Sequence, residues 1–165
     1  MPKIVILGNA VKQRRVPVCY QWMAENAEIF EASIVWDIGC GPKAFWYEWL
    51  KERLPATCYL GLMDKAYGNA YDQASYKSPW LCPFATQVRP NWIVMSNVVN
   101  CQETSFEVKK LIHDSLCLAQ DGVIFNYPAS PRYSSVSKPE IDAILSEVAW
   151  HVDYIPGRKM WVCFP

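Results

Sequence analysis

The sequence has no excess of charge of either sign, no cysteine pair at metal-binding spacing and no long hydrophobic run. Its 16 lysine and arginine residues equal its 16 aspartate and glutamate residues, which disfavours indiscriminate binding to a nucleic-acid backbone. The cysteines number seven, an odd count, and none forms a Cys-x-x-Cys pair, so a disulfide framework or a zinc cluster is not indicated. The apolar block at residues 4–7 is too short for a signal peptide core, and no segment reaches the length of a membrane span. These features predict a cytoplasmic protein without a membrane partner.

Histidine is scarce as well. The two histidines, His113 and His151, stand at no spacing typical of metal ligands, so we expect no metal cofactor. Ser134 and Ser135 have no accompanying pattern for acyl transfer. The sequence therefore indicates neither metal catalysis nor serine-based acyl transfer.

Hydrophobic and aromatic residues are abundant instead. They make up 52% and 14% of the 165 residues, and this length allows one sizeable core but not two. The aromatic side chains supply core volume and surfaces on which a flat ligand can stack. We therefore predict one domain that spans residues 1–165.

Apolar runs and turn residues divide the chain into alternating strands and helices. Strands are predicted at 3–7, 34–36, 57–63, 92–95, 123–125, 148–155 and 159–164. Helices are predicted over 17–30 and 45–54, from a capping box at 104–107 to a stop at Asp121-Gly122, and from a second capping box at 137–140.

This alternation predicts a three-layer α/β fold with helices on both faces of a mostly parallel sheet. Pro156-Gly157 fits the central pair of a type II turn, so the last two strands should form an antiparallel hairpin. We expect the strands at 34–36 and 92–95 to be neighbours at the sheet centre, with a ligand at their carboxyl ends.

The strand at 34–36 runs into Asp37-Ile-Gly39-Cys-Gly41. Glycines without a Cβ let the backbone approach a ligand closely, so Gly39→Val should block the site and leave the fold nearly intact. Asp64 ends the next strand, where a carboxylate can accept hydrogen bonds from both ribose hydroxyls of an adenosine. The spacing up to Ala44 also permits NAD, but Asp37 would repel a pyrophosphate and can anchor the cationic amino end of S-adenosylmethionine.

These residues resemble the first motif of the class I (Rossmann-like) S-adenosylmethionine-dependent methyltransferases. Asp64 matches the ribose-binding acid of that family, residues 92–100 resemble its fourth-strand segment, and the final hairpin matches its reversed last strand. The resemblance covers residues 33–165 and implies the three-layer fold, S-adenosyl-L-methionine as cofactor and methyltransferase activity. The cofactor-binding residues that it implies are Asp37, Gly39, Cys40, Gly41, Pro42, Asp64, Lys65 and Asn97.

The sequence motifs do not specify the methyl acceptor. The fourth-strand segment lacks the Asn-Pro-Pro-Tyr of base amino-group methyltransferases and the Pro-Cys of cytosine-carbon methyltransferases. No general base is indicated, and positioning of the acceptor can supply much of the rate acceleration. The predicted acceptor-binding residues are Asn126, Tyr127 and Arg132.

We expect the acceptor to enter between the loop at 126–136 and the amino-terminal segment that carries Arg14, Arg15 and Tyr20. Aromatic faces beside cations suit a flat or anionic acceptor, which includes a small molecule or an exposed nucleic-acid base.

Two alternative functions belong to other classes. The first is a protein that binds S-adenosylmethionine without transferring its methyl group, which the small size of the chain favours. The second is a nicotinamide-dependent oxidoreductase, which Asp37 disfavours. Titration with S-adenosylmethionine, its demethylated product and NAD distinguishes these alternatives.

Overall fold

The computed structural model of the protein describes residues 15–40, 45–63, 89–128 and 136–165. The helical elements are α2 (Val18–Glu25), η1 (Ala27–Phe30), α3 (Tyr47–Lys51), η5 (Val99–Cys101), α4 (Ser105–Leu118) and α5 (Lys138–Val148). The strands are β1 (Ile34–Ile38), β2 (Tyr59–Met63), β3 (Trp92–Met95), β4 (Gly122–Asn126), β5 (His151–Ile155) and β6 (Met160–Phe164). The strand predicted at 3–7 lies outside the described residues, as does most of 65–90.

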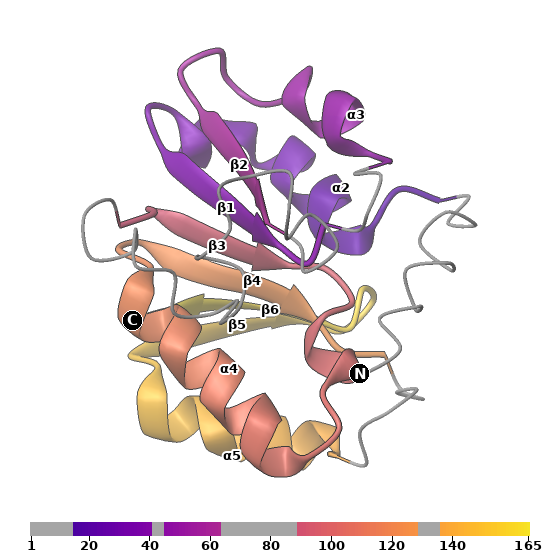
Figure 1. The fold of residues 1–165 in the computed structure, drawn as a ribbon, viewed down its shortest axis with the longest axis vertical. Coiled ribbons are helices and arrows are strands. Elements are labelled where there is room, and N and C mark those ends of the chain that lie inside the picture. The colour runs from indigo at the N-terminus through magenta and orange to yellow at the C-terminus, as the bar shows by residue number, and fades with distance from the viewer. Residues whose placement is uncertain (1–14, 41–44, 64–88, 129–135) are drawn as a thin grey trace.

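The strands form one sheet in the order β2-β1-β3-β4-β6-β5 (Figure 1). Strands β2, β1, β3 and β4 are parallel, whereas β6 runs antiparallel to both β4 and β5. In the register of β1 and β3, Val35 lies opposite Trp92 and Asp37 opposite Val94. The predicted fold class, the central pair of strands and the carboxyl-terminal hairpin are therefore confirmed.

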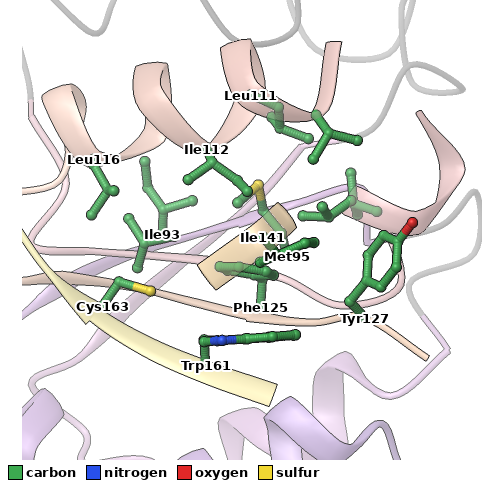
Figure 2. Packing of buried hydrophobic residues seen from close by; sticks show 14 of the residues in the cluster. Ile93, Met95, Leu111, Ile112, Leu116, Phe125, Tyr127, Ile141, Trp161 and Cys163 are labelled. Atoms are coloured by element: carbon green, nitrogen blue, oxygen red, sulfur yellow. The ribbon is translucent and has the colours of Figure 1, made fainter. Parts of the chain in front are cut away.

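Helices cover both faces of the sheet (Figure 1). The sheet therefore divides the hydrophobic core that the sequence predicts into two, with one core on each face. Residues of α2, η1 and α3 pack against one face, where Val35, Val94 and Ile124 point. Residues of α4 and α5 pack against the other face, where Trp36, Ile93 and Phe125 point. Figure 2 shows this second core, in which Phe125 and Trp161 stack with ring centroids 5.1 Å apart. Among the described residues, no helix is both long and apolar enough to cross a bilayer.

Both predicted capping boxes are present. Thr104 Oγ1 accepts a hydrogen bond from the Glu107 N–H at 3.1 Å, and the Glu107 carboxylate accepts from the Thr104 N–H at 3.3 Å. Ser137 and Glu140 make the same reciprocal pair at the start of α5. These bonds satisfy N–H groups that the first turn of a helix cannot pair internally.

Some predicted boundaries are wrong. The helix predicted over 17–30 changes to a 3₁₀ turn after Glu25. Helix α5 continues to Val148, so the strand predicted from 148 begins at His151. Strand β1 extends to Ile38 and therefore includes Asp37. Hydrophobic periodicity locates an element more reliably than it locates its ends.

The hairpin is present, but its predicted type II turn is wrong. A type II turn requires a positive φ at its third residue, here Gly157, and the positive φ of 49° is at Lys159 instead. The Ile155 carbonyl accepts from the Arg158 N–H at 3.1 Å, within a loop of four residues between the paired Ile155 and Met160. Longer hairpin loops of this kind commonly place their left-handed residue at the end of the loop.

One asparagine joins the amino ends of three parallel strands. Asn91 Oδ1 accepts a hydrogen bond from the Ile34 N–H at 2.8 Å, and Asn91 Nδ2 donates to Asp121 Oδ2 at 3.0 Å. The Asn91 carbonyl also accepts from the N–H groups of Asp121 and Gly122. These bonds fix the starts of β1, β3 and β4 relative to one another.

Gly122 belongs to this end of the sheet. The sequence predicts that Asp121-Gly122 ends the helix before it, and this prediction is wrong. Helix α4 ends at Leu118, and Gly122 is the first residue of β4. A Cβ at Gly122 would lie 2.4 Å from Trp92 Cζ3 and 2.9 Å from the Cys163 carbonyl oxygen. The glycine is therefore required by the close approach of the neighbouring strands.

Candidate functional site

The carboxyl ends of β1 and β3 meet where the strand order reverses. From β1 the chain continues outward to β2 on one side, and later enters β3 on the other side. Loops that leave two neighbouring strands in opposite directions open a crevice, and α/β proteins bind their ligands at such points. The glycine motif follows β1 at this position.

Asp37 lies within β1 and is completely buried. It points to the face of the sheet that α2 covers, and the Tyr20 hydroxyl donates a hydrogen bond to Asp37 Oδ2. A buried carboxylate needs such donors, because loss of hydration otherwise disfavours its charged form. Helix α2 therefore fixes the position of the carboxylate.

Gly39 makes the turn after β1 with a φ of 78°, a conformation that costs little for glycine only. A Cβ at Gly39 would lie 2.4 Å from Val98 Cγ2 and 3.4 Å from Val98 Cγ1. The turn after β1 thus packs directly on the turn after β3. The expectation that Gly39→Val leaves the fold nearly intact is contradicted by this contact and by the positive φ.

Val98 is itself held by its neighbours. Its carbonyl oxygen accepts hydrogen bonds from the Cys101 N–H at 3.0 Å and from Gln102 Nε2 at 2.9 Å. Its side chain is buried. The surface against which Gly39 packs is therefore a fixed one.

Asn97 and Asn126 bind each other across the carboxyl ends of β3 and β4. The Asn97 N–H donates to Asn126 Oδ1 at 2.7 Å, and Asn126 Nδ2 donates to Asn97 Oδ1 at 2.7 Å. Asn97 has a φ of 58°, which asparagine tolerates better than most residues. The pair fixes the direction in which the chain leaves β3.

Cys19 of α2 completes this polar cluster. Its thiol lies 3.7 Å from Asn126 Oδ1, as a donor to it. Burial raises the pKa of the Cys19 thiol well above its usual range, and the negative charge of Asp37 raises it further. The thiol therefore stays protonated, and Cys19 acts here as a hydrogen-bond donor rather than as a nucleophile.

Solved structures with this arrangement of strands and helices are known. The chain matches magnesium protoporphyrin IX methyltransferase from Synechocystis, solved with bound SAH, with a TM-score of 0.56, 12% identity and coverage of 87% of this chain and 77% of that one. It matches a SAM-bound amino pentose methyltransferase from Micromonospora echinaspora, involved in calicheamicin biosynthesis, with a TM-score of 0.55, 13% identity and coverage of 94% and 95%. The fold is that of the class I methyltransferases. No protein-family model matches the chain, and no curated protein matches it significantly.

The methyltransferase fold brings part of the predicted cofactor site together. Asp37, Gly39 and Asn97 lie at the facing ends of β1 and β3, and Cys40 follows them with a partly exposed side chain. Four further residues of the predicted cofactor site lie outside the described residues: Gly41, Pro42, Asp64 and Lys65.

The predicted acceptor residues are less exposed than a binding site suggests. Tyr127 is 5% exposed and packs in the core under α4 and α5, and Figure 2 shows it at one edge of that cluster. Its hydroxyl has no hydrogen-bond partner among the described residues. Asn126 is occupied by Asn97, and Tyr20, expected at the acceptor entrance, is buried against Asp37. Arg132 lies outside the described residues, as does Arg14.

Sequence reasoning missed the roles of Cys19 and Val98 and the bond between Tyr20 and Asp37. Cys19 and Tyr20 lie beside the apolar positions of the first predicted helix. Those positions predicted that the helix packs on the core, but they did not predict a contact with a carboxylate. Val98 stands in an apolar pair after β3. No spacing rule connects any of these residues with the glycine motif.

Proposed function

We propose that this chain is an S-adenosylmethionine-dependent methyltransferase. The turn after β1 carries the proposal: Gly39, at positive φ, lies at the reversal of strand order beside the buried Asp37. In the methyltransferase fold, structures solved with SAM or SAH have the same overall architecture as this chain. A glycine turn at this point of this fold supports the assignment of a nucleoside ligand to the site.

The charge at the turn fits a cationic cofactor. The carboxylate of Asp37 lies in a low-dielectric environment, where it attracts a sulfonium or ammonium group more strongly than it would in water. The same carboxylate would repel the pyrophosphate of a dinucleotide. This sign of charge favours S-adenosylmethionine over NAD.

The residues that would hold the cofactor would contact different parts of it. The cofactor would approach the backbone at Gly39, Cys40, Gly41 and Pro42, and Asp64 with Lys65 would reach its ribose. Asn97 would line the opposite side from the end of β3. When bound, S-adenosylmethionine supplies a methyl group on a good leaving group. The protein then has to align the acceptor with that methyl group and exclude water.

The acceptor site belongs to the same proposal. Tyr127 and Arg132 would bind a flat or anionic small molecule or an exposed nucleic-acid base, and Asn126, whose amide is bonded to Asn97, precedes them in the chain. Support comes from Tyr127, whose buried hydroxyl has no hydrogen-bond partner among the described residues, because buried polar groups usually have one. A cytoplasmic location is part of the proposal too.

Isothermal titration with S-adenosylmethionine, its demethylated product and NAD tests the cofactor assignment. We expect the first two ligands to bind and NAD to show no heat of binding. Asp64→Ala should weaken binding by about one to two decades, because lost ribose hydrogen bonds cost about 1–3 kcal/mol. Binding of NAD alone, or an unchanged affinity in Asp64→Ala, would contradict the assignment. Binding without any methyl transfer would support the non-catalytic alternative.

Tyr127→Phe tests the acceptor site more cleanly than Tyr127→Ala, because alanine would leave a cavity in the core under α4 and α5. Acceptors are found by transfer of a labelled methyl group to a panel of small molecules and short RNAs. We expect Tyr127→Phe to keep its affinity for the cofactor and to lose turnover on the acceptor found. Unchanged turnover would place the acceptor elsewhere.

A further inference from the structure

The side-chain amide of Asn126 is hydrogen-bonded within the protein, which leaves it poorly placed to contact a substrate. It is 7% exposed, and its amide binds the side chain of Asn97 and the backbone N–H of Asn97 at once. The Cys19 thiol also points to its oxygen. Two bonds of 2.7 Å to one neighbouring residue fix that residue in position and in orientation.

The bond to the Asn97 N–H has a structural consequence. Asn97 adopts a φ of 58°, and a left-handed residue other than glycine persists only where its surroundings hold it. From Asn97 the chain continues directly to Val98, whose Cγ2 lies 2.4 Å from the position of a Cβ on Gly39. A chain of direct contacts therefore leads from β4, through the turn after β3, to the glycine turn after β1.

We propose that Asn126 is a positioning residue for the glycine turn, and that it acts through Asn97 and Val98. The inference rests on the proposed function where it concerns cofactor affinity. It replaces a direct substrate contact as the role of Asn126.

The test compares Asn126→Ala with Asn91→Ala in the full chain. Asn91 is a matched control, since its amide also joins neighbouring strands, but at the opposite end of the sheet. We expect both variants to unfold at lower temperature. Only Asn126→Ala should raise the Kd for S-adenosylmethionine, by roughly tenfold, with kcat at saturating cofactor changed less than about threefold. Asn126→Asp keeps the acceptor oxygen and should give an intermediate Kd.

A second readout needs no cofactor. Amide hydrogen exchange at residues 38–40 should become faster in Asn126→Ala and stay unchanged in Asn91→Ala. If the wild-type chain binds no S-adenosylmethionine, the proposed function fails, and exchange still decides the positioning role. Equal exchange and equal Kd in the two variants would overturn the inference.

The opposite edge of the sheet carries a second, independent feature. Strand β5 pairs with β6 on one side, and no strand of the described residues pairs with its other side. Open edges invite pairing, and natural edge strands usually carry lysine, proline or a bulge against it. Strand β5 has neither lysine nor proline, and Trp150 beside it is 84% exposed.

The sequence of this edge is symmetric in chemistry about Val152. In an antiparallel pair of two copies centred there, His151 lies opposite Asp153 of the second copy, and Trp150 opposite Tyr154. An imidazole N–H donor thus faces a carboxylate, and an aromatic ring faces an aromatic ring, both of which are favourable cross-strand pairs. His151 and Asp153 already meet at 2.9 Å within one copy, so they lie on one face of the strand.

We infer that a second copy of this chain pairs with β5 about a two-fold axis at Val152. Such an interface is self-complementary, as two-fold symmetry requires. It joins the two sheets into one and covers Trp150.

Sedimentation velocity over a range of concentrations tests this pairing. We expect a dimer in the wild type and a monomer in Asp153→Lys. The double variant H151D/D153H exchanges the donor and the acceptor of each cross-strand pair, so it should remain a dimer. Glu52→Lys on the exposed α3 side is the control and should leave the dimer intact. A wild-type monomer at all concentrations, or a dimer that Asp153→Lys does not weaken, would overturn the inference.

Discussion

Each end of the parallel strands carries an asparagine whose side-chain amide joins neighbouring strands. At the amino end, Asn91 binds the Ile34 N–H and the carboxylate of Asp121. At the carboxyl end, Asn126 binds both the side chain and the backbone of Asn97. Both amides are short-range clamps between strands, with bonds of 2.7–3.0 Å.

The two ends differ in what the amide holds. Asn91 secures the first residues of regular strands, so its bonds stabilise the sheet without shaping a turn. Asn126 secures a left-handed residue from which the chain turns onto the glycine motif. The same residue type thus contributes stability at one end of the sheet and the geometry of a turn at the other.

The largest effect is expected where glycine is replaced at the two ends. Gly39→Ala should lose about 2–4 kcal/mol of unfolding free energy, because a positive φ and a contact with Val98 both oppose a Cβ. Gly122→Ala should lose about 1–3 kcal/mol from overpacking against Trp92. Chemical denaturation measures both, and titration should show weaker cofactor binding only in Gly39→Ala.

Gly157→Ala is the control, since nothing lies within 4 Å of its Cβ position. Its unfolding free energy should stay the same or rise slightly. Equal loss of cofactor affinity in Gly39→Ala and Gly122→Ala would remove the distinction between the two ends.

Tyr20→Phe should have the next largest effect. It removes a hydrogen bond to the buried Asp37 carboxylate, and bonds to charged groups contribute about 1.5–3 kcal/mol. Thermal unfolding followed by circular dichroism measures the loss. Tyr127→Phe is a matched control, because its hydroxyl has no partner among the described residues, and it should not lower stability. A similar loss in both variants would refute the special role of the Tyr20 hydroxyl.

Thr104→Ala tests whether closeness to the carboxyl end is enough to affect the site. Thr104 caps α4 shortly after the turn that follows β3, but within the described part of the chain its side chain binds only the start of its own helix. Loss of a helix cap costs about 1 kcal/mol. We expect lower stability in urea and an unchanged Kd for the cofactor. A raised Kd would show that the whole edge, and not the Asn126 contacts, shapes the site.

The smallest expected effect is on the pH dependence of stability, through Asp142, which is remote from both Asn91 and Asn126. Partial burial would raise the pKa of Asp142, but hydrogen bonds from Lys138 and Trp161 outweigh it and leave that pKa below its usual value. A carboxyl group with a lowered pKa stabilises the fold above its unfolded pKa, about 3.9, and loses this contribution as pH falls through its folded pKa.

Stability measured by urea unfolding should therefore decline below about pH 4, and less steeply in Asp142→Asn. The difference at neutral pH should be a few tenths of a kcal/mol, since the pair is partly exposed. Equal slopes in acid would show that other carboxylates account for the decline.

Much of the fold was predictable from sequence because its signals are local. The capping residues Thr104 and Ser137 mark the starts of two helices, since they bind N–H groups three residues away. The apolar run Trp92–Met95 marks a strand buried on both faces. The turn type at Gly157 was wrong because loop length and register, and not the Pro-Gly pair alone, determine which residue takes a positive φ.

The candidate site was predictable only in part. The glycine motif predicted a turn after β1, and the structure has a turn there with Asp37 and Asn97 beside it; its role as a binding turn stays a prediction. The partners of these residues were not predictable, and neither was the burial of Tyr127, because side-chain direction after a strand depends on which face the neighbouring helices cover.

Residues close together in the chain specify the alternation of strands and helices, the caps and the position of the glycine turn. Only folding brings Tyr20 to Asp37, 17 residues away, and Asn126 to Asn97, 29 residues away. The strand order brings these residues together, and strand order follows from how all the apolar faces pack at once. For that reason the partners of the site residues are a property of the folded sheet and not of any one segment.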